Sequence, residues 1–247
     1  MATLILLRHG RTNSNASGTL AGRQPTELDE TGRAQAVAVG HRLAAAKVPL
    51  AAVVTSPLLR CTQTLRLALP DAVPEAEPRL VEAGYGDWEG QPLKTLAKQP
   101  LWQVVQAHPS AARFPGAAGE SMAEMSARAV AAVREWDARL GTDAVWLACS
   151  HGDVIKAIVA DALGMHLDLF QRVVVDPGSL TVIRYTPLRP FLLTANDTGG
   201  DLSGLRPPRR RSRRRAAAAS SDAVVGGGAG PDDRQGVVGT ERIGSKA

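Results

Sequence analysis

The sequence predicts an α/β fold, specifically a three-layer α/β/α sandwich around a mostly parallel central sheet. Short apolar runs alternate with longer segments whose apolar residues recur at helical spacing, a pattern typical of strands joined by covering helices. The 247 residues are 44% apolar, which is enough to bury a substantial core without disulfides or metal ions. One main domain is therefore expected.

Four short apolar runs are predicted to be strands. They cover residues 4–7, 50–54, 145–148 and 180–185. Prolines between 187 and 190 separate the last run from residues 191–194, so a hairpin or edge strand is expected there.

Helix starts are marked by capping residues. Asp29 can cap a helix running to about residue 45, and Ser56 before Pro57 predicts a capped helix after the second strand. Ser121 and Glu124 fit a capping box. The apolar residues after this box have near-helical spacing and are expected in the core: Met122, Met125, Ala129, Val130, Val133, Trp136 and Leu140.

The net charge of +5 is concentrated near the C-terminus. From Arg206 onward there are 10 Lys or Arg against 4 Asp or Glu, which leaves 19 against 20 before it. We place the boundary near Leu202, with a domain at 1–202 and a disordered Arg-, Ala- and Gly-rich tail at 203–247.

The tail contains two runs that resemble binding sites. Arginines within 209–215 are a candidate patch for nucleic acid or another polyanion, but no aromatic residues are interleaved, so a solvated extension is favoured. The glycine run at 226–230 lacks the strand, turn and helix of a nucleotide site and is assigned to the same low-complexity tail.

Cellular context follows from cysteine use and hydropathy. Cys61 and Cys149 are far apart and lack the paired spacing of zinc sites or disulfide frameworks, which favours a reducing, cytoplasmic setting. No apolar stretch approaches the roughly 20 residues that span a bilayer. The oligomeric state is left open.

Polar clusters follow three of the predicted strands directly. Arg8 and His9 follow the first, residues 55–60 ending in Arg60 follow the second, and His151 with Gly152 follows another. In open α/β sheets ligands bind at the carboxyl ends of the strands, so these groups should converge. Imidazole can attack phosphorus while guanidinium groups bind phosphoryl oxygens, which indicates a phosphate ester as substrate with no metal or cofactor required.

The reaction also needs a proton donor for the leaving oxygen. Glu82 is the best candidate, because it lies in a glycine-rich segment able to approach a ligand closely. Nearby arginines would keep His9 unprotonated near neutral pH, and a backbone acceptor could fix its tautomer.

Four ordered motifs carry a family resemblance. They are Leu7-Arg8-His9-Gly10 with Thr12 and Asn15; Ser56 to Arg60 with Gln63 and Thr64; Glu82 with Gly86, Trp88, Glu89 and Gly90; and Ser150-His151-Gly152 with Ile155 and Lys156. Over most of residues 3–200 the chain resembles the phosphatase branch of the histidine phosphatase (phosphoglycerate mutase-like) superfamily.

The resemblance implies a role for each matching residue. His9 would be the nucleophile that is transiently phosphorylated, and Glu82 the general acid and then the base. His151 would complete the catalytic set and the phosphate pocket. The remaining phosphate-binding residues would be Arg8, Arg60, Asn15 and Gly152. The implied function is metal-independent hydrolysis of a small phosphorylated metabolite.

Two alternatives stay open. A 2,3-bisphosphoglycerate-dependent phosphoglycerate mutase shares the phosphohistidine, but such mutases carry a hydroxyl residue where this chain has Ala21 before Gly22, and an arginine pair that residues 91–120 lack. A non-catalytic polyanion-binding protein is disfavoured by retention of all the catalytic residue types. Arg11 and Asp153 also depart from the family pattern, which puts the specificity in question.

Overall fold

The computed structural model describes residues 2–199, 225, 226 and 228. In this part of the chain six strands form one sheet, in the order β3-β2-β4-β1-β5-β6. The strands are β1 (Thr3–Arg8), β2 (Leu50–Thr55), β3 (Glu75–Ala76), β4 (Val145–Ser150), β5 (Leu180–Arg184) and β6 (Phe191–Asp197).

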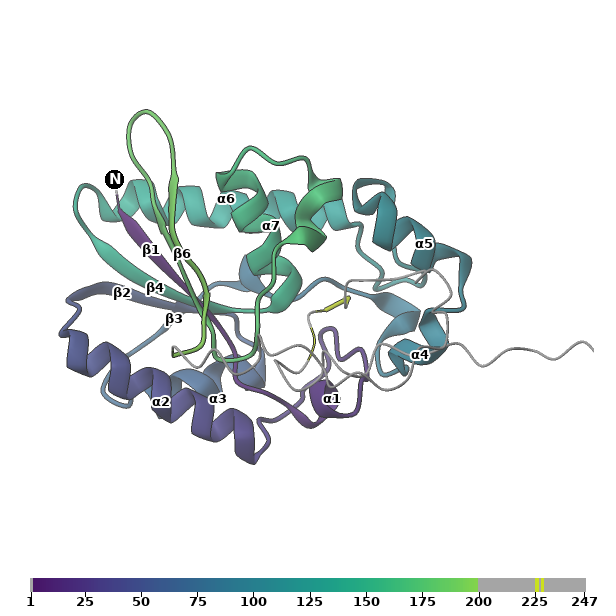
Figure 1. Cartoon of the computed structure of the whole chain (residues 1–247), viewed down its shortest axis with the longest axis horizontal. Helices are drawn as coiled ribbons and strands as arrows, with labels where there is room; N and C mark the ends of the chain where they lie inside the picture. Colours follow the sequence, from purple (N-terminus) through teal and green to yellow (C-terminus); the bar gives the residue numbers. More distant parts are fainter. Residues whose placement is uncertain (1, 200–224, 227, 229–247) are drawn as a thin grey trace, which may run out of the picture.

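Helices cover both faces of the sheet. The α-helices are α1 (Asn13–Ala16), α2 (Glu30–Ala46), α3 (Leu59–Ala68), α4 (Leu93–Leu96), α5 (Pro100–Ala107), α6 (Met122–Leu140) and α7 (Gly152–Ala162). Single turns of 3-10 helix lie at η1 (Pro78–Leu80), η2 (Gly86–Trp88) and η3 (Pro109–Ala111), with a longer one at η4 (Leu167–Arg172). Because α2 and α3 lie on one face and α6 and α7 on the other (Figure 1), the predicted three-layer sandwich is confirmed.

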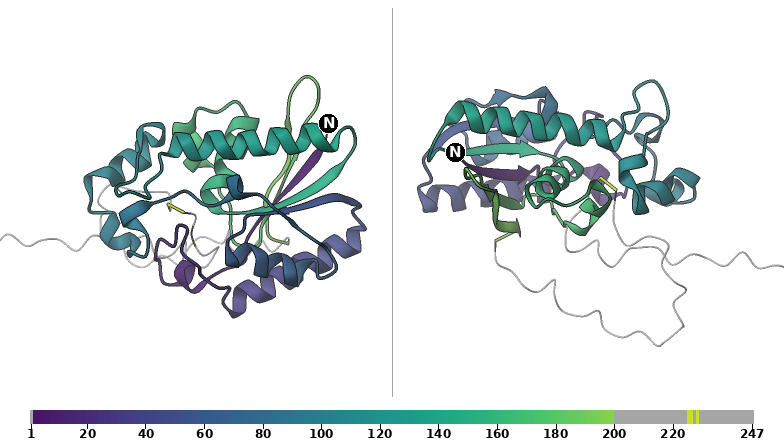
Figure 2. Two further views of the ribbon diagram at one scale, coloured as in Figure 1. Left: turned by 180° about the vertical axis from the view of Figure 1, so that it is seen from behind. Right: turned by 90° about the horizontal axis from the view of Figure 1, so that it is seen from above.

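Strand direction decides where the functional residues lie. The pairs β1–β4, β2–β4 and β2–β3 are parallel, whereas β5 is antiparallel to both β1 and β6. Arg8 is in register with Ser150, and Thr55 with Cys149. The carboxyl ends of β1, β2 and β4 therefore meet at one edge of the sheet, as the views in Figure 2 also show.

The predicted helix starts are confirmed in two cases and wrong in one. The Asp29 side chain accepts from the Gly32 amide, and the Ser121–Glu124 capping box is complete. The helix after β2 instead begins at Leu59 with Leu58 as its N-cap and no side-chain cap. The hydroxyl of Ser56 instead contacts His151.

The core contains the residues expected from α6. Five of its predicted residues are buried and two, Val130 and Leu140, are only partly covered. Trp136 stacks on Trp146 of β4 with ring centroids 5.9 Å apart, which joins α6 to the sheet. Strand β3 is not predicted by the sequence, because its two exposed residues give no hydropathy pattern.

The predictions about the tail fall mostly outside the described residues. The boundary near Leu202 and the basic run at 209–215 lie there, so both stay predictions. Within the described residues, no helix is both long and apolar enough to cross a membrane.

Candidate active site

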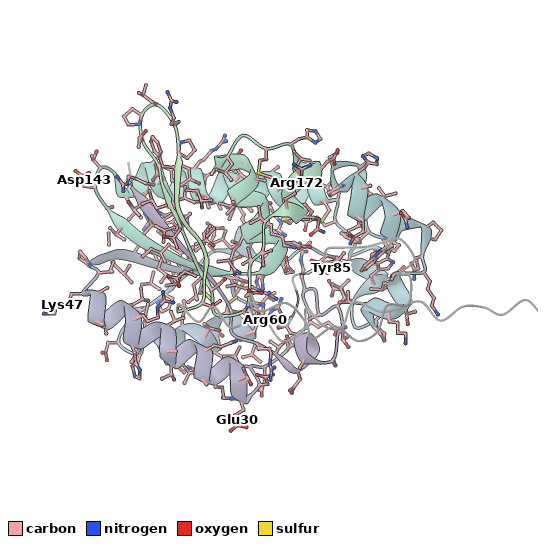
Figure 3. The ribbon with its side chains drawn as sticks, viewed as in Figure 1. Glu30, Lys47, Arg60, Tyr85, Asp143 and Arg172 are labelled. Carbon is pink, nitrogen blue, oxygen red and sulfur yellow. The ribbon has the colours of Figure 1, made fainter. Side chains whose placement is uncertain are left out.

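The polar residues at the strand ends form one buried cluster. Figure 3 labels Arg60 and Tyr85, which lie toward the carboxyl ends of the parallel strands, whereas Lys47 and Asp143 lie at the opposite end of the sheet. His9 is 3% exposed and Arg60 2%, although both are polar. Buried polar groups require partners, so the contacts of each decide its chemical state.

The contacts of His9 determine which ring nitrogen carries the proton. Arg60 Nε lies 3.2 Å from His9 Nε2, and a guanidinium can only donate, so Nε2 is the acceptor. The other nitrogen, Nδ1, lies 2.8 Å from the Gly10 carbonyl oxygen and donates to it. Assigned from these partners, the proton is on Nδ1 and the lone pair is on Nε2. The sequence predicts a backbone acceptor but not its position, and the structure places it at Gly10 O.

Electrostatics keep His9 neutral. Burial first, and then the positive charges of Arg60 and Arg8, lower the pKa of His9 well below the usual value for histidine. The imidazole is consequently unprotonated at neutral pH, the form that can act as a nucleophile.

The two arginines are held by backbone carbonyl groups. Arg60 donates from Nη2 to Gly22 O at 2.7 Å and from Nη1 to Gln24 O at 3.2 Å. Arg8 donates from Nη1 to Val175 O at 2.8 Å. Burial lowers the pKa of Arg8 to about 10, so it remains positively charged at neutral pH.

His151 lies beside His9 and contacts Ser56, the serine that the sequence predicts as a helix cap. The two rings have centroids 5.2 Å apart and planes tilted by 58°. Nε2 of His151 is 2.7 Å from the Ser56 hydroxyl oxygen. Burial, followed by the charge of Arg60, lowers the pKa of His151 well below its usual value. Ser56 thus orients His151 and does not cap α3.

The carboxyl group of Glu82 has a pKa above the usual value for glutamate. Its Oε1 accepts from the Ala83 amide at 3.0 Å. Burial raises its pKa to about 7, and the nearby negative charge of Asp153 adds to the increase, against the smaller effects of Arg60 and Arg8. A carboxyl group with this pKa can give and take a proton near neutral pH.

The cluster opens into a cavity. Of the predicted site residues, His9, Asn15, Arg60 and Glu82 line it. Arg8, His151 and Gly152 lie behind this surface; Gly152 is the first residue of α7 and is buried. Asn15 uses its amide oxygen to accept from the Thr12 hydroxyl at 2.9 Å, so its amide nitrogen is the group left to reach a ligand.

Comparison with known proteins agrees with this geometry. The model of the histidine phosphatase superfamily (branch 1) matches residues 4–198. The chain belongs to the histidine phosphatase superfamily. Its similar proteins include named phosphatases, which confirms the resemblance seen in the motifs and the expectation of an enzyme of the phosphatase type.

Three similar proteins show the range of this superfamily. Glucosyl-3-phosphoglycerate phosphatase of Mycolicibacterium vanbaalenii is 34% identical, over 67% of this chain and 76% of the relative. A 2,3-bisphosphoglycerate-dependent phosphoglycerate mutase of a Methylobacterium species is 31% identical, over 63% and 78%. The solved structure of Bacillus stearothermophilus YhfR is 28% identical, covers 80% of this chain and 98% of its own, and superimposes with a TM-score of 0.72.

This histidine phosphatase has site residues that the sequence analysis missed or set aside. Asp153 is fully buried, and its Oδ2 accepts from the Tyr85 hydroxyl at 2.8 Å. Val225, Gly226 and Gly228, assigned above to the low-complexity tail, line the cavity. A valine before a glycine run inside a basic tail was the only available signal, and no local pattern links it to a strand end more than two hundred residues away.

Proposed function

We propose that this histidine phosphatase hydrolyses small phosphate monoesters through a phosphohistidine on His9, without a metal ion. The observation that carries the proposal is the state of His9, whose Nδ1 donates to Gly10 O and whose Nε2 accepts from Arg60. A neutral, oriented imidazole beside two guanidinium groups has the parts that phosphoryl transfer requires.

The first step forms the covalent intermediate. The Nε2 lone pair of His9 attacks phosphorus in line, the N–P bond forms, and the ester P–O bond breaks. Glu82, with a pKa of about 7, gives its proton to the leaving oxygen. Arg8, Arg60 and His151 stabilise the negative charge of the transferring group, with Asn15 and the amide of Gly152 at the N-terminus of α7 as further donors.

The second step returns the enzyme to its starting state. Glu82, now ionised, accepts a proton from water, whose oxygen attacks phosphorus as the N–P bond breaks. The products are an alcohol and inorganic phosphate, and His9 regains its neutral form. The same carboxyl group thus serves as acid and then as base, which a pKa near neutrality allows.

The substrate class follows from the relatives and from the site. A phosphorylated metabolite is proposed, since the similar mycobacterial enzyme is named as a phosphatase of glucosyl-3-phosphoglycerate. Hydrolysis is favoured over isomerisation, because Ala21 lines the cavity where mutases use a hydroxyl side chain. A cytoplasmic location is part of the proposal, based on the unpaired cysteines Cys61 and Cys149.

The decisive experiment is phosphate release from a panel of phosphomonoesters in the presence of EDTA. Wild type is compared with His9→Ala and with His41→Ala, a histidine outside the motifs. Release that disappears only in His9→Ala supports the proposal. Equal release by wild type and His9→Ala contradicts it, as does release that requires an added divalent ion.

A further inference from the structure

The glycine-rich segment, defined here as Val225, Gly226 and Gly228, is built into the domain. Val225 is 1% exposed and packs within the hydrophobic cluster that contains Leu20 and Tyr85. Its described residues form the short yellow piece beside α1 and α7 in Figures 1 and 2. A side chain buried to this extent belongs to the packed interior.

Glycine is required where the segment passes the pocket. Gly226 has φ +75°, and a Cβ added to it would lie 3.0 Å from Leu20 Cδ1 and 3.5 Å from the Tyr85 hydroxyl oxygen. Both the left-handed backbone and the close approach disfavour any other residue. A glycine at this position thus lets the backbone approach the buried side chains of Arg8 and Asp153.

The backbone of the segment contacts two charged groups of the site. Arg8 donates from Nη1 to Gly228 O at 2.9 Å and from Nη2 to Gly226 O at 3.4 Å. In the opposite sense, the Gly226 amide donates to Asp153 Oδ2 at 3.1 Å, the oxygen that also accepts from Tyr85. One short stretch of backbone therefore pairs with a cation through its carbonyl groups and with an anion through its amide.

The segment and the reacting groups line one cavity. Val225, Gly226 and Gly228 line the same cavity as His9, Arg60 and Glu82. The polar contacts of the segment are with Arg8 and Asp153, which lie behind the cavity surface, and not with the attacking nitrogen of His9. The segment therefore forms one wall of the cavity.

We propose that the glycine-rich segment is part of the active site, as a wall of the cavity that holds Arg8 and Asp153 in position behind the reacting groups. The carbonyl groups of Val175, Gly226 and Gly228 hold the Arg8 guanidinium in one orientation. An oriented guanidinium binds phosphoryl oxygens with less loss of freedom. The amide of Gly226 donates a hydrogen bond to the buried Asp153 carboxylate. The negative charge of this carboxylate raises the pKa of Glu82. Gly226 and Gly228 are thus positioning residues. This inference rests on the proposed function.

The test displaces the segment in the full chain. Val225→Asp places a charge at a buried apolar position, and Gly226→Val introduces a clash and a disfavoured backbone conformation, so both should move the segment out of the pocket. Loss of hydrogen bonds to a charged group predicts a fall of about tenfold in kcat/KM and a rise of about tenfold in the inhibition constant of inorganic phosphate. The phosphate measurement reports on Arg8, which a purely structural role would not change.

The matched control is Gly164→Ala. Gly164 also has positive φ, +66°, but a Cβ there meets nothing within 4 Å, so the substitution adds similar backbone strain away from the cavity. It should leave kcat/KM and phosphate inhibition unchanged. Unchanged or increased kcat/KM in both segment variants would overturn the inference, the increase meaning that the segment blocks the site. Failure of the proposed function would give a different result, because His9→Ala would then release as much phosphate as wild type.

Discussion

The Nε atom of Arg60 donates to Nε2 of His9 across 3.2 Å, so a guanidinium covers the nitrogen that attacks phosphorus. The same side chain is fixed by Gly22 O, which orients its planar fork before substrate arrives. Substrate must exchange this contact for one between the guanidinium and a phosphoryl oxygen. Arg60 is therefore expected to act in binding and in transition-state stabilisation together.

Arg60→Lys should lower kcat/KM by about 100-fold or more, because an ammonium group lacks the planar set of donors that contacts both His9 and a phosphoryl group. Steady-state kinetics on one phosphomonoester would measure this. Arg66→Lys, an exposed arginine on the same helix, is the control and should match wild type. Near-normal activity of Arg60→Lys would remove Arg60 from the proposed mechanism.

The pH profile should report on Glu82. Its pKa is raised to about 7, so the protonated acid is lost as pH rises through that value and kcat/KM should fall there. Asp153→Asn removes a negative charge that raises this pKa, so the fall should move to lower pH, while Arg8 and Arg60 continue to lower it. Asp161→Asn, on the same helix but paired with Arg134, should leave the profile in place. Coincident profiles for wild type and Asp153→Asn would refute the coupling.

Ser56→Ala should lower kcat/KM by about tenfold, because the hydroxyl that orients His151 across 2.7 Å is removed from a buried site. The fold should persist, since α3 takes no cap from this side chain. Kinetics together with a thermal melt separate the two effects. Ser126→Ala on α6 serves as the comparison; a loss of melting temperature in Ser56→Ala with unchanged kcat/KM would assign Ser56 a structural role only.

Isomerisation should be absent or slow. With 3-phosphoglycerate and its 2,3-bisphosphate cofactor, we expect phosphate release to exceed formation of 2-phosphoglycerate, because water and not a held hydroxyl recaptures the phosphoryl group. NMR of the phosphorus signals can follow both products in one sample. Mutase turnover faster than hydrolysis would replace the proposed function with the alternative.

The tight approach of Gly10 and Gly32 predicts a stability effect. A Cβ on Gly32 would lie 2.0 Å from Arg11 O, and one on Gly10 would lie 2.3 Å from Gly32 O. Gly32→Ala should therefore lower the free energy of unfolding by about 1–3 kcal/mol through overpacking and weaken catalysis by shifting Gly10 O from His9. Glu30→Ala at the exposed start of α2 should change stability by less than about 1 kcal/mol. Urea titration of both variants makes the comparison.

Sequence alone predicted most of the sheet and most of the residues that gather at its carboxyl edge, because the residues at a strand end indicate both the strand and the position of the polar groups that follow it. An apolar run followed by Arg8 and His9 specifies a strand and also the edge where those side chains emerge. Ser56 was misassigned because a serine before a proline is a good local cap, whereas its contact with His151 spans 95 residues of sequence. The glycine-rich segment was missed for the same reason, since its contacts with Arg8 span 218 and 220 residues.

The hydrogen bond from His9 Nδ1 to Gly10 O also constrains the identity of the covalent intermediate. Phosphohistidine exists as two regioisomers, one on each ring nitrogen, and they differ in chemical lability. With Nδ1 committed to a carbonyl oxygen and Nε2 facing the cavity, only the isomer phosphorylated at Nε2 can form without rotation of the ring. A trapped intermediate would thus be chemically uniform, and its regiochemistry is set by a single peptide group.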